Sequence, residues 1–201
     1  MSNKDDEDGD FIEIKAILAG GSGVGKTNLI NVTIGKEFCQ GSKTTSCCSM
    51  VQKHLVINDN KYLINLWDTM GQESYKSISK LFFRDSKIVI FVYDITSYES
   101  FKGLEDWINL ANDTINDDYI SGIVGNKDDL YLESKVPKEE AENYALSKNM
   151  KFRLVSAKEN PQEFEDFLIE LIKQIKIPER RKKTILKKEE KEKENKNNCN
   201  C

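Results

Sequence analysis

Several features that would place a chain in a membrane, in a secreted fold or around a metal are missing here. None of the 201 residues lies in an apolar run of 18 or more, so we expect no transmembrane helix. The first residues are acidic and lack the apolar stretch of a signal peptide. The single histidine, His54, leaves too few ligands for a metal site built on the five cysteines, and a disulfide is not expected in a cytosolic chain. We therefore expect Cys47 and Cys48 to fill small apolar sites, with redox control as the alternative.

Charge divides the chain into three segments. Residues 178–201 carry nine Lys/Arg and five Glu, so they are net +4, whereas the whole chain is net −4 and the rest is net −8. An acidic body without a basic stripe argues against nucleic-acid binding. We expect residues 1–10 to be an acidic flexible N-terminus, 11–177 to form one domain, and 178–201 to be a disordered tail. The basic cluster 180–183 either attracts anionic lipid or belongs to a solvated linker, and both interpretations stay open.

Residues 20–27 read Gly-Gly-Ser-Gly-Val-Gly-Lys-Thr, the pattern G-x-x-x-x-G-K-[ST] of a phosphate-binding loop. The preceding run 11–19 alternates like a strand, and 28–34 has the apolar spacing of a helix, so phosphates would lie at a helix N-terminus. Lys26 can reach the β- and γ-phosphates, and Thr27 offers a hydroxyl to Mg²⁺. The predicted phosphate-binding residues are Ser22, Gly23, Val24, Gly25, Lys26, Thr27 and Asn28.

Two further motifs follow strand-like runs. They predict a Mg²⁺ position, a contact to the γ-phosphate and the identity of the base. In the first, Trp67–Glu73, Asp68 stands at a strand end and suits a position just behind the direct ligands of a Mg²⁺ ion. Gly71 can bring its N–H against a γ-phosphate with no side chain in the way. In the second, Gly125–Asp129, Asp129 can accept hydrogen bonds from N1–H and the 2-amino group of guanine. Adenine has neither donor, which favours a guanine site.

A last short motif, Ser156-Ala157-Lys158, follows the strand-like run 152–155. In this order and spacing the motifs resemble the Rab family of Ras-like small GTPases. The resemblance covers roughly 11–177 and the ending Cys199-Asn200-Cys201. It implies an α/β fold, the P-loop NTPase small G domain, with a six-stranded, mostly parallel sheet and helices on both faces. Nucleotide is then expected beyond the carboxyl ends of the strands.

The resemblance also assigns base-binding roles. It implies that Asn126 stabilises the loop and the base, that Lys127 lies along the base plane, and that Asp129 reads the base. The Ala157 amide would face guanine O6, within the segment Ser156, Ala157 and Lys158. Phe38 falls where the family packs an aromatic ring on guanine, although a loop residue that covers the sheet edge is the alternative.

Catalytic roles follow in the same way. The resemblance implies slow GTP hydrolysis with Mg²⁺, in which Lys26 neutralises charge and Gln72 orients the attacking water. Thr45, with Thr44 as its rival, would bind Mg²⁺ in the first switch, and Gly71 would contact the γ-phosphate in the second. Arg84 is the only arginine before Arg153 and lies beyond the second switch, so a partner is expected to complete the site.

The implied output is a GTP/GDP switch in vesicle trafficking on the cytosolic face of an endomembrane, cycling with the cytosol. Its implied partners are effectors, an exchange factor, a GTPase-activating protein, a GDP-dissociation inhibitor and the prenylation machinery. Cys199 and Cys201 would carry two geranylgeranyl chains, which give stable anchoring where one chain is marginal. We expect a monomer.

Some residues depart from the family pattern. Ser46–Met50 (SCCSM) replaces the usual Ile-Gly-x-x-Phe, Met70 replaces a small alanine, Ser74-Tyr75 replaces Arg-Phe, and Phe82-Phe83 replaces a tyrosine pair. These changes predict altered partner choice, and Met70 raises the alternative of a GTP-binding scaffold that scarcely hydrolyses. An ATP-using P-loop enzyme is disfavoured by the guanine-reading motif.

The remaining pattern predicts the rest of the fold. Strands are expected at 49–57 and 61–67, joined by a hairpin turn at 58–60, and a strand buried on both faces at 87–93. One helix is expected over 97–112, another from Pro137, and a last amphipathic helix over 164–175.

Overall fold

The computed structural model describes residues 11–41, 48–69 and 76–176, with the backbone alone for 76–79. Phe11–Gln174 forms one compact unit. The N-terminal segment 1–10 and the tail 178–201 lie outside the described residues, as do Thr44, Thr45, Met70, Gly71 and Gln72.

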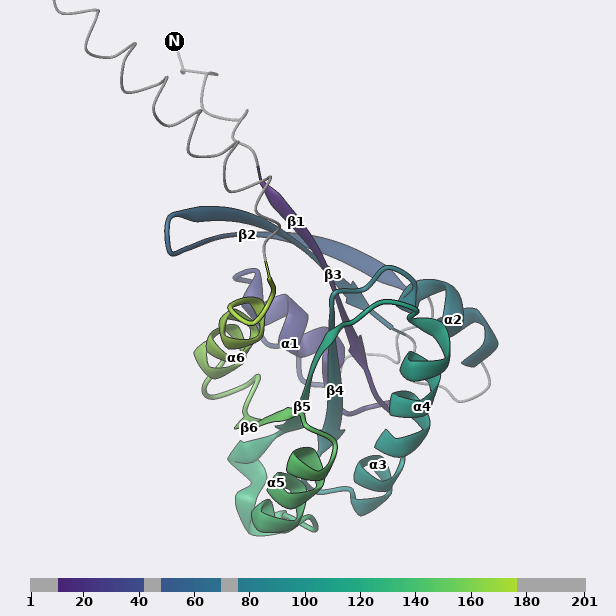
Figure 1. The fold of residues 1–201 in the computed structure, drawn as a ribbon. Coiled ribbons are helices and arrows are strands. Elements are labelled where there is room, and N and C mark those ends of the chain that lie inside the picture. The colour runs from purple at the N-terminus through teal and green to yellow at the C-terminus, as the bar shows by residue number, and fades with distance from the viewer. Residues whose placement is uncertain (1–10, 42–47, 70–75, 177–201) are drawn as a thin grey trace, which may run out of the picture. The chain divides into compact units, whose positions relative to one another are not determined.

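The core is one six-stranded sheet in the order β2-β3-β1-β4-β5-β6 (Figure 1). β2 is antiparallel to β3 and the other neighbouring pairs are parallel, as predicted from the sequence. The strands are β1 (Ile12–Ala19), β2 (Ser49–Ile57), β3 (Asn60–Asp68), β4 (Ile88–Asp94), β5 (Ile120–Asn126) and β6 (Lys151–Val155).

Helices cover both faces of this sheet. α1 (Lys26–Thr33) and α6 (Gln162–Ile172) lie on one face, and α2 (Lys76–Phe83), α3 (Tyr98–Lys102) and α4 (Leu104–Thr114) lie on the other (Figure 1). α5 (Lys138–Ser147) packs on β5 and β6, and a 3₁₀ helix, η2 (Asp128–Glu133), follows β5. Every residue of β4 is buried, which explains its continuous apolar sequence in the middle of the sheet.

The hairpin between β2 and β3 forms as expected. Asn58 and Asp59 have positive φ angles of 49° and 62°, which two-residue turns between antiparallel strands require and which these residue types tolerate. Ile57 and Asn60 pair directly across the turn. β2 is therefore the edge strand of the sheet. β3 runs back from the turn beside it and ends at Asp68.

The helix predicted over 97–112 is wrong as a single element. Ser97 caps its start, since its side chain accepts a hydrogen bond from the Ser100 amide at 3.3 Å, but the helix is divided at Gly103 into α3 and α4. Gly103 itself keeps helical angles, φ −65° and ψ −11°, but glycine has the lowest helix propensity after proline, which weakens a continuous helix at this point. The sequence reading also omitted α2 and η2, both of which are short. Among the described residues no helix is long and apolar enough to cross a membrane.

Candidate functional site

A cavity of about 400 Å³ lies beyond the carboxyl ends of β1, β3 and β5, where ligands bind in open α/β sheets. Five segments line it: the loop before α1 with the first turn of that helix, the segment after α1, Thr69 after β3, the end of β5 with η2, and the loop after β6. The lining residues are Ser22, Gly23, Gly25, Lys26, Thr27, Asn28, Phe38, Cys39, Gln40, Gly41, Thr69, Asn126, Lys127, Asp129, Leu130, Ala157 and Lys158.

The loop between β1 and α1 depends on glycine at two close approaches. Gly20 has φ 154°, and a Cβ there would overlap the Val92 carbonyl oxygen. Gly25 has φ 96° and caps α1, and a Cβ there would overlap the Asn126 side-chain nitrogen. Only glycine combines this backbone conformation with so little space. The loop therefore lies directly against β4 and β5, with the N-terminus of α1 open to the cavity.

Lys26 is buried at the base of this loop. Its ammonium donates to the carbonyl oxygens of Gly20 and Gly21, each at 2.8 Å, so the side chain curls back over the loop. Burial lowers the pKa of Lys26 from 10.5 to about 8, and the nearby Asp68 carboxylate opposes this shift. A phosphate anion would supply the opposite charge that this desolvated ammonium needs.

Two oxygen-bearing side chains meet beside Lys26. The Thr27 hydroxyl donates to Asp68 Oδ2 at 2.7 Å, which joins the first turn of α1 to the end of β3. Hydroxyl and carboxylate oxygens are the hard donors that Mg²⁺ prefers, and Mg²⁺ usually takes only one or two protein ligands. Among the described residues, no group of three or more His, Cys, Asp or Glu side chains could hold a metal ion. The donor set fits Mg²⁺ bound together with a phosphate.

Asn126 joins the two ends of the cavity. Its side-chain nitrogen donates to the Val24 carbonyl oxygen at 2.8 Å, and its side-chain oxygen accepts from the Ala157 amide at 3.3 Å. The residue is 2% exposed. One side chain at the end of β5 therefore fixes the phosphate loop and the loop after β6 relative to each other.

Asp129 lies opposite, in the first turn of η2. Its Oδ1 accepts a hydrogen bond from the Ser156 hydroxyl at 2.6 Å, and Lys158 approaches Oδ2 at 3.9 Å. Ser156 in turn accepts from the backbone amides of Lys158 and Glu159 at 3.2 and 3.0 Å. This network orients the carboxylate at the cavity wall, as a reader of two donors on a base requires.

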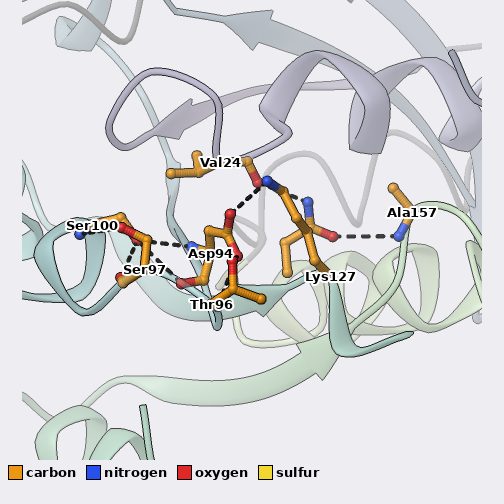
Figure 2. Close-up of polar contacts among 8 residues, drawn as sticks. Val24, Asp94, Thr96, Ser97, Ser100, Lys127 and Ala157 are labelled. Carbon is orange, nitrogen blue, oxygen red and sulfur yellow. Dashed lines mark hydrogen bonds and ion pairs between the residues drawn. The ribbon is translucent and has the colours of Figure 1, made fainter. Parts of the chain in front are cut away.

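Lys127 lies between these groups, and its ammonium forms an ion pair with Asp94 at the end of β4 (Figure 2). Its backbone has φ 69°, an uncommon conformation for a residue with a side chain. The chain therefore turns sharply at Lys127, directly after β5, while the ammonium is held at Asp94. Because Lys127 also lines the cavity, its aliphatic stem is available as an apolar wall for a flat ring.

The segment after α1 is tied to the helix by Asn28. Its side-chain nitrogen donates to the Cys39 carbonyl oxygen at 3.0 Å, and its oxygen accepts from the Cys39 amide at 3.4 Å. Phe38, which precedes the clamped residue, is 36% exposed and lines the cavity. Cys39 has an exposed thiol outside any disulfide, and His54 is a β2 residue whose ring packs edge-on against Phe11.

The structure brings together the described members of the predicted site. Val24, Asp68 and Ser156 do not line the cavity but hold residues that do, through the bonds given above. The predicted residues Thr45, Gly71, Gln72, Cys199 and Cys201 lie outside the described residues.

Other cavity residues were missed by the sequence reading. Thr69 donates to the Leu18 carbonyl at 2.6 Å and is buried beside the phosphate loop. Asp94, which does not line the cavity but pairs with Lys127, was not predicted as a site residue either, although it ends β4 in register with Asn126, which ends β5. A polar residue at the end of a buried strand was the available signal. Gln40, Gly41 and Leu130 line the cavity from loops and a 3₁₀ helix and carry no such signal.

Comparison with known proteins gives a consistent assignment. The family model for the Ras family matches residues 15–177. The chain is 35% identical over 154 residues to the Ras-related protein Rab-30 of Homo sapiens, which covers 77% of this chain and 75% of that protein. It is 32% identical over 159 residues to the Ras-related protein RABA2a of Arabidopsis thaliana, covering 79% and 73% respectively. It is 33% identical over 152 residues to the Ras-related protein Rab-11C of Dictyostelium discoideum, covering 76% and 67%.

Proposed function

The chain belongs to the Rab family of Ras-like small GTPases, which bind guanine nucleotide and hydrolyse GTP, and we propose that it recruits effectors in vesicle trafficking as a GTP/GDP switch. The observation that carries this proposal is the single cavity that holds a phosphate loop at one end and Asp129 at the other. The Asn126 side chain supports it, because it fixes the two ends at one spacing.

The base end of the cavity binds guanine in this proposal. Asp129 accepts from N1–H and the 2-amino group, and the Ala157 amide donates to O6. The Lys127 stem and the Phe38 ring lie along the two faces of the base. Adenine would leave the Asp129 carboxylate desolvated without donors, so the site rejects it.

The phosphate end binds the β- and γ-phosphates through Lys26 and the backbone amides of 22–28. Thr27 would bind Mg²⁺ directly, with Thr45 as a further ligand, and Asp68 would lie just behind them, bonded to Thr27. When bound, Mg²⁺ neutralises charge that develops on the phosphate oxygens. Lys26 adds a fixed positive charge that needs no reorganisation, since its ammonium already lies against the loop. Gln72 orients the attacking water.

Switching depends on two segments that contact the nucleotide only when it carries a γ-phosphate. Thr45 and Gly71 lie in these segments, and the γ-phosphate holds both, so its loss releases them. Effectors bind the ordered state. An exchange factor, a GTPase-activating protein and a GDP-dissociation inhibitor act on the cycle. The arginine content of 11–177 supports a partner that supplies the missing charge, since Arg84 and Arg153 are its only arginines.

The tail anchors the switch to the cytosolic face of an endomembrane. Cys199 and Cys201 carry two prenyl chains, and the basic residues 180–183 add attraction to anionic lipid. Replacing both cysteines with serine is expected to abolish lipid incorporation by prenylation machinery and move the protein to the cytosol. A double variant that still incorporates lipid and stays on the membrane would refute the proposed anchoring.

A hydrolysis-impaired scaffold is the second candidate, and it rests on Met70, which stands where the family has a small residue before Gly71. Single-turnover hydrolysis in the presence of a GTPase-activating protein separates the candidates. An active switch turns over quickly as wild type, whereas a scaffold stays slow until Met70→Ala restores the rate.

The test of the guanine site is a change of base preference in Asp129→Asn. An asparagine amide donates where the carboxylate accepted, so it suits the 2-oxo group of xanthine and loses its fit to guanine. We expect affinity for GDP to fall by at least 100-fold, equivalent to about 3 kcal/mol, and affinity for xanthosine diphosphate to rise. Asp128→Asn is the control, because Asp128 is the neighbouring carboxylate in η2 and does not line the cavity. An unchanged preference in Asp129→Asn would refute the assignment.

A further inference from the structure

The ion pair between Asp94 and Lys127 lies at the edge of the cavity that the function requires. Lys127 Nζ contacts Asp94 Oδ2, and the two side chains are 34% and 10% exposed. Their residues are 33 positions apart and come from the ends of the neighbouring strands β4 and β5. The pair is therefore built by the sheet and is not a chance contact along a helix.

The Asp94 carboxylate is fixed before it meets Lys127. Its Oδ1 accepts from the Thr96 amide at 2.8 Å and from the Thr96 hydroxyl at 2.7 Å (Figure 2). Both bonds use the same oxygen, which leaves Oδ2 for the ammonium.

The backbone of Asp94 is held as well. Its amide donates to the Ser100 hydroxyl at 3.0 Å, and that hydroxyl donates to the carbonyl oxygens of Asp94 and Ser97 at 3.2 and 2.7 Å. Figure 2 shows Ser97 and Ser100 beside Asp94, on the side away from Lys127. The start of α3 thus locks the turn that presents the carboxylate.

We propose that Asp94 is a positioning residue for guanine nucleotide, which acts by holding Lys127 extended across the cavity. A free lysine samples many rotamers, and a base that lies along its stem must pay for ordering it. Here the ion pair has ordered the stem already, so less conformational entropy is lost on binding. The positive φ of Lys127 supports this role, since the backbone adopts it to direct the side chain between Asp94 and the cavity.

The inference rests on the guanine-nucleotide site proposed above and adds a residue to it. A purely structural role for Asp94 is the rival explanation, because the same aspartate organises the turn into α3. The two differ in one respect. If Asp94 acts by positioning Lys127, replacing Asp94 has no further effect once Lys127 is removed. If its role is purely structural, replacing it has the same effect in either background.

The experiment is a double-mutant cycle on the dissociation rate of a fluorescent GDP from the full chain. Asp94→Asn keeps the shape and the oxygen that accepts from Thr96 but removes the negative charge. We expect dissociation about tenfold faster in Asp94→Asn. The Lys127→Met variant is itself expected to release GDP faster than wild type. Adding Asp94→Asn to it is expected to change the dissociation rate by less than twofold. Tyr98→Phe in α3 is the matched control, since it removes one 2.6 Å bond to Glu140 of α5 and has no bond to Asp94 or Lys127.

Two results would overturn the inference. One is an unchanged rate in Asp94→Asn, and the other is a tenfold effect that persists in the Lys127→Met background. If Asp94→Asn does not fold, Thr96→Val replaces it, because it removes one of the two bonds to Oδ1 and leaves the charge. That variant is expected to release GDP about threefold faster with Lys127 present and at an unchanged rate without it. Failure of the wild-type chain to bind GDP at all would instead refute the proposed function.

Discussion

The side-chain nitrogen of Asn126 donates a hydrogen bond to the carbonyl oxygen of Val24 at 2.8 Å, across 102 positions of the chain. The side-chain oxygen of Asn126 accepts from the Ala157 amide, so the side chain bridges Val24 and Ala157. A variant that loses only the nitrogen therefore tests this bridge. Asn126→Asp keeps an acceptor for Ala157 and sets a carboxylate oxygen against the Val24 carbonyl. We expect GDP affinity to fall about 100-fold, or about 3 kcal/mol, as judged by the dissociation rate of a fluorescent analogue.

Asn112→Asp is the matched control for this change. The Asn112 side-chain oxygen accepts from the Tyr119 hydroxyl at 2.7 Å on the exposed surface, and Asn112 does not line the cavity. Its GDP affinity should equal that of wild type. Equal affinity in Asn126→Asp as well would mean that the two ends of the cavity do not need this bridge.

Burial of Lys26 predicts a pH dependence of nucleotide binding. In the empty protein burial lowers the pKa of Lys26 to about 8, and bound phosphates raise it again by their negative charge. Above pH 8 binding must therefore take up a proton, so affinity for GDP falls as pH rises, by at most tenfold per pH unit. Below pH 8 the lysine is already charged and this contribution is flat.

Lys26→Arg isolates the contribution of the lysine, since a guanidinium keeps its proton throughout this range. GDP affinity is measured for both proteins by titration calorimetry from pH 7 to pH 10. The ionisation of guanine itself affects both proteins equally, so it cancels in the ratio of their affinities. The ratio of wild-type to variant affinity should fall above pH 8. A constant ratio would show that Lys26 does not titrate in the empty site.

Gly20 and Gly21 form a natural comparison in the phosphate loop. A Cβ on Gly20 would overlap the Val92 carbonyl oxygen at a φ of 154°, whereas one on Gly21 would make an ordinary contact of 3.8 Å with Val24. Gly20→Ala should lower the free energy of unfolding by about 3 kcal/mol through strain and overpacking. Gly21→Ala should change it by less than about 1 kcal/mol. Urea unfolding of both variants with GDP present would decide, and equal stabilities would contradict the close approach.

The Asn28 clamp on Cys39 predicts coupling to Phe38. Asn28→Ala removes both bonds to the Cys39 backbone, so the Phe38 ring loses its fixed place at the cavity. We expect GDP to dissociate about fivefold faster, and Phe38→Ala to have less effect in the Asn28→Ala background than in wild type. Additive effects would show that the clamp does not act through Phe38. Asn31→Ala, in the same helix, is a control whose side chain faces no part of the cavity lining.

The sequence predicted those parts of the site that depend on local backbone geometry. The phosphate loop, Asp68 and the motif 125–129 each follow one strand directly, and a strand end places them at the sheet edge whatever the rest of the chain does. The six-stranded sheet was implied by the family resemblance, and the structure confirms it. Gly20, by contrast, was recognised only as part of a pattern, and its need for glycine depends on Val92 in another strand.

What the sequence did not predict depends on contacts between distant segments. Asp94 matters through Lys127, and Thr69 through Leu18, and neither partner is near in the chain. The division of the helix at Gly103 was missed because the apolar spacing continues across it. The short helix α2 was missed as well, although Ile78, Leu81 and Phe82 have helical spacing, because it spans only eight residues.

The most direct test of the account is the identity of the nucleotide released when the purified protein is denatured, measured by chromatography. The account predicts GDP or GTP at close to one per chain in the wild type, and a strong loss of both in Asp129→Asn. A predominance of GTP would in addition favour slow hydrolysis at Met70. Adenine nucleotide in place of guanine, or an empty protein that binds no added GDP, would contradict the central claim that Lys26 and Asp129 form one guanine-nucleotide site.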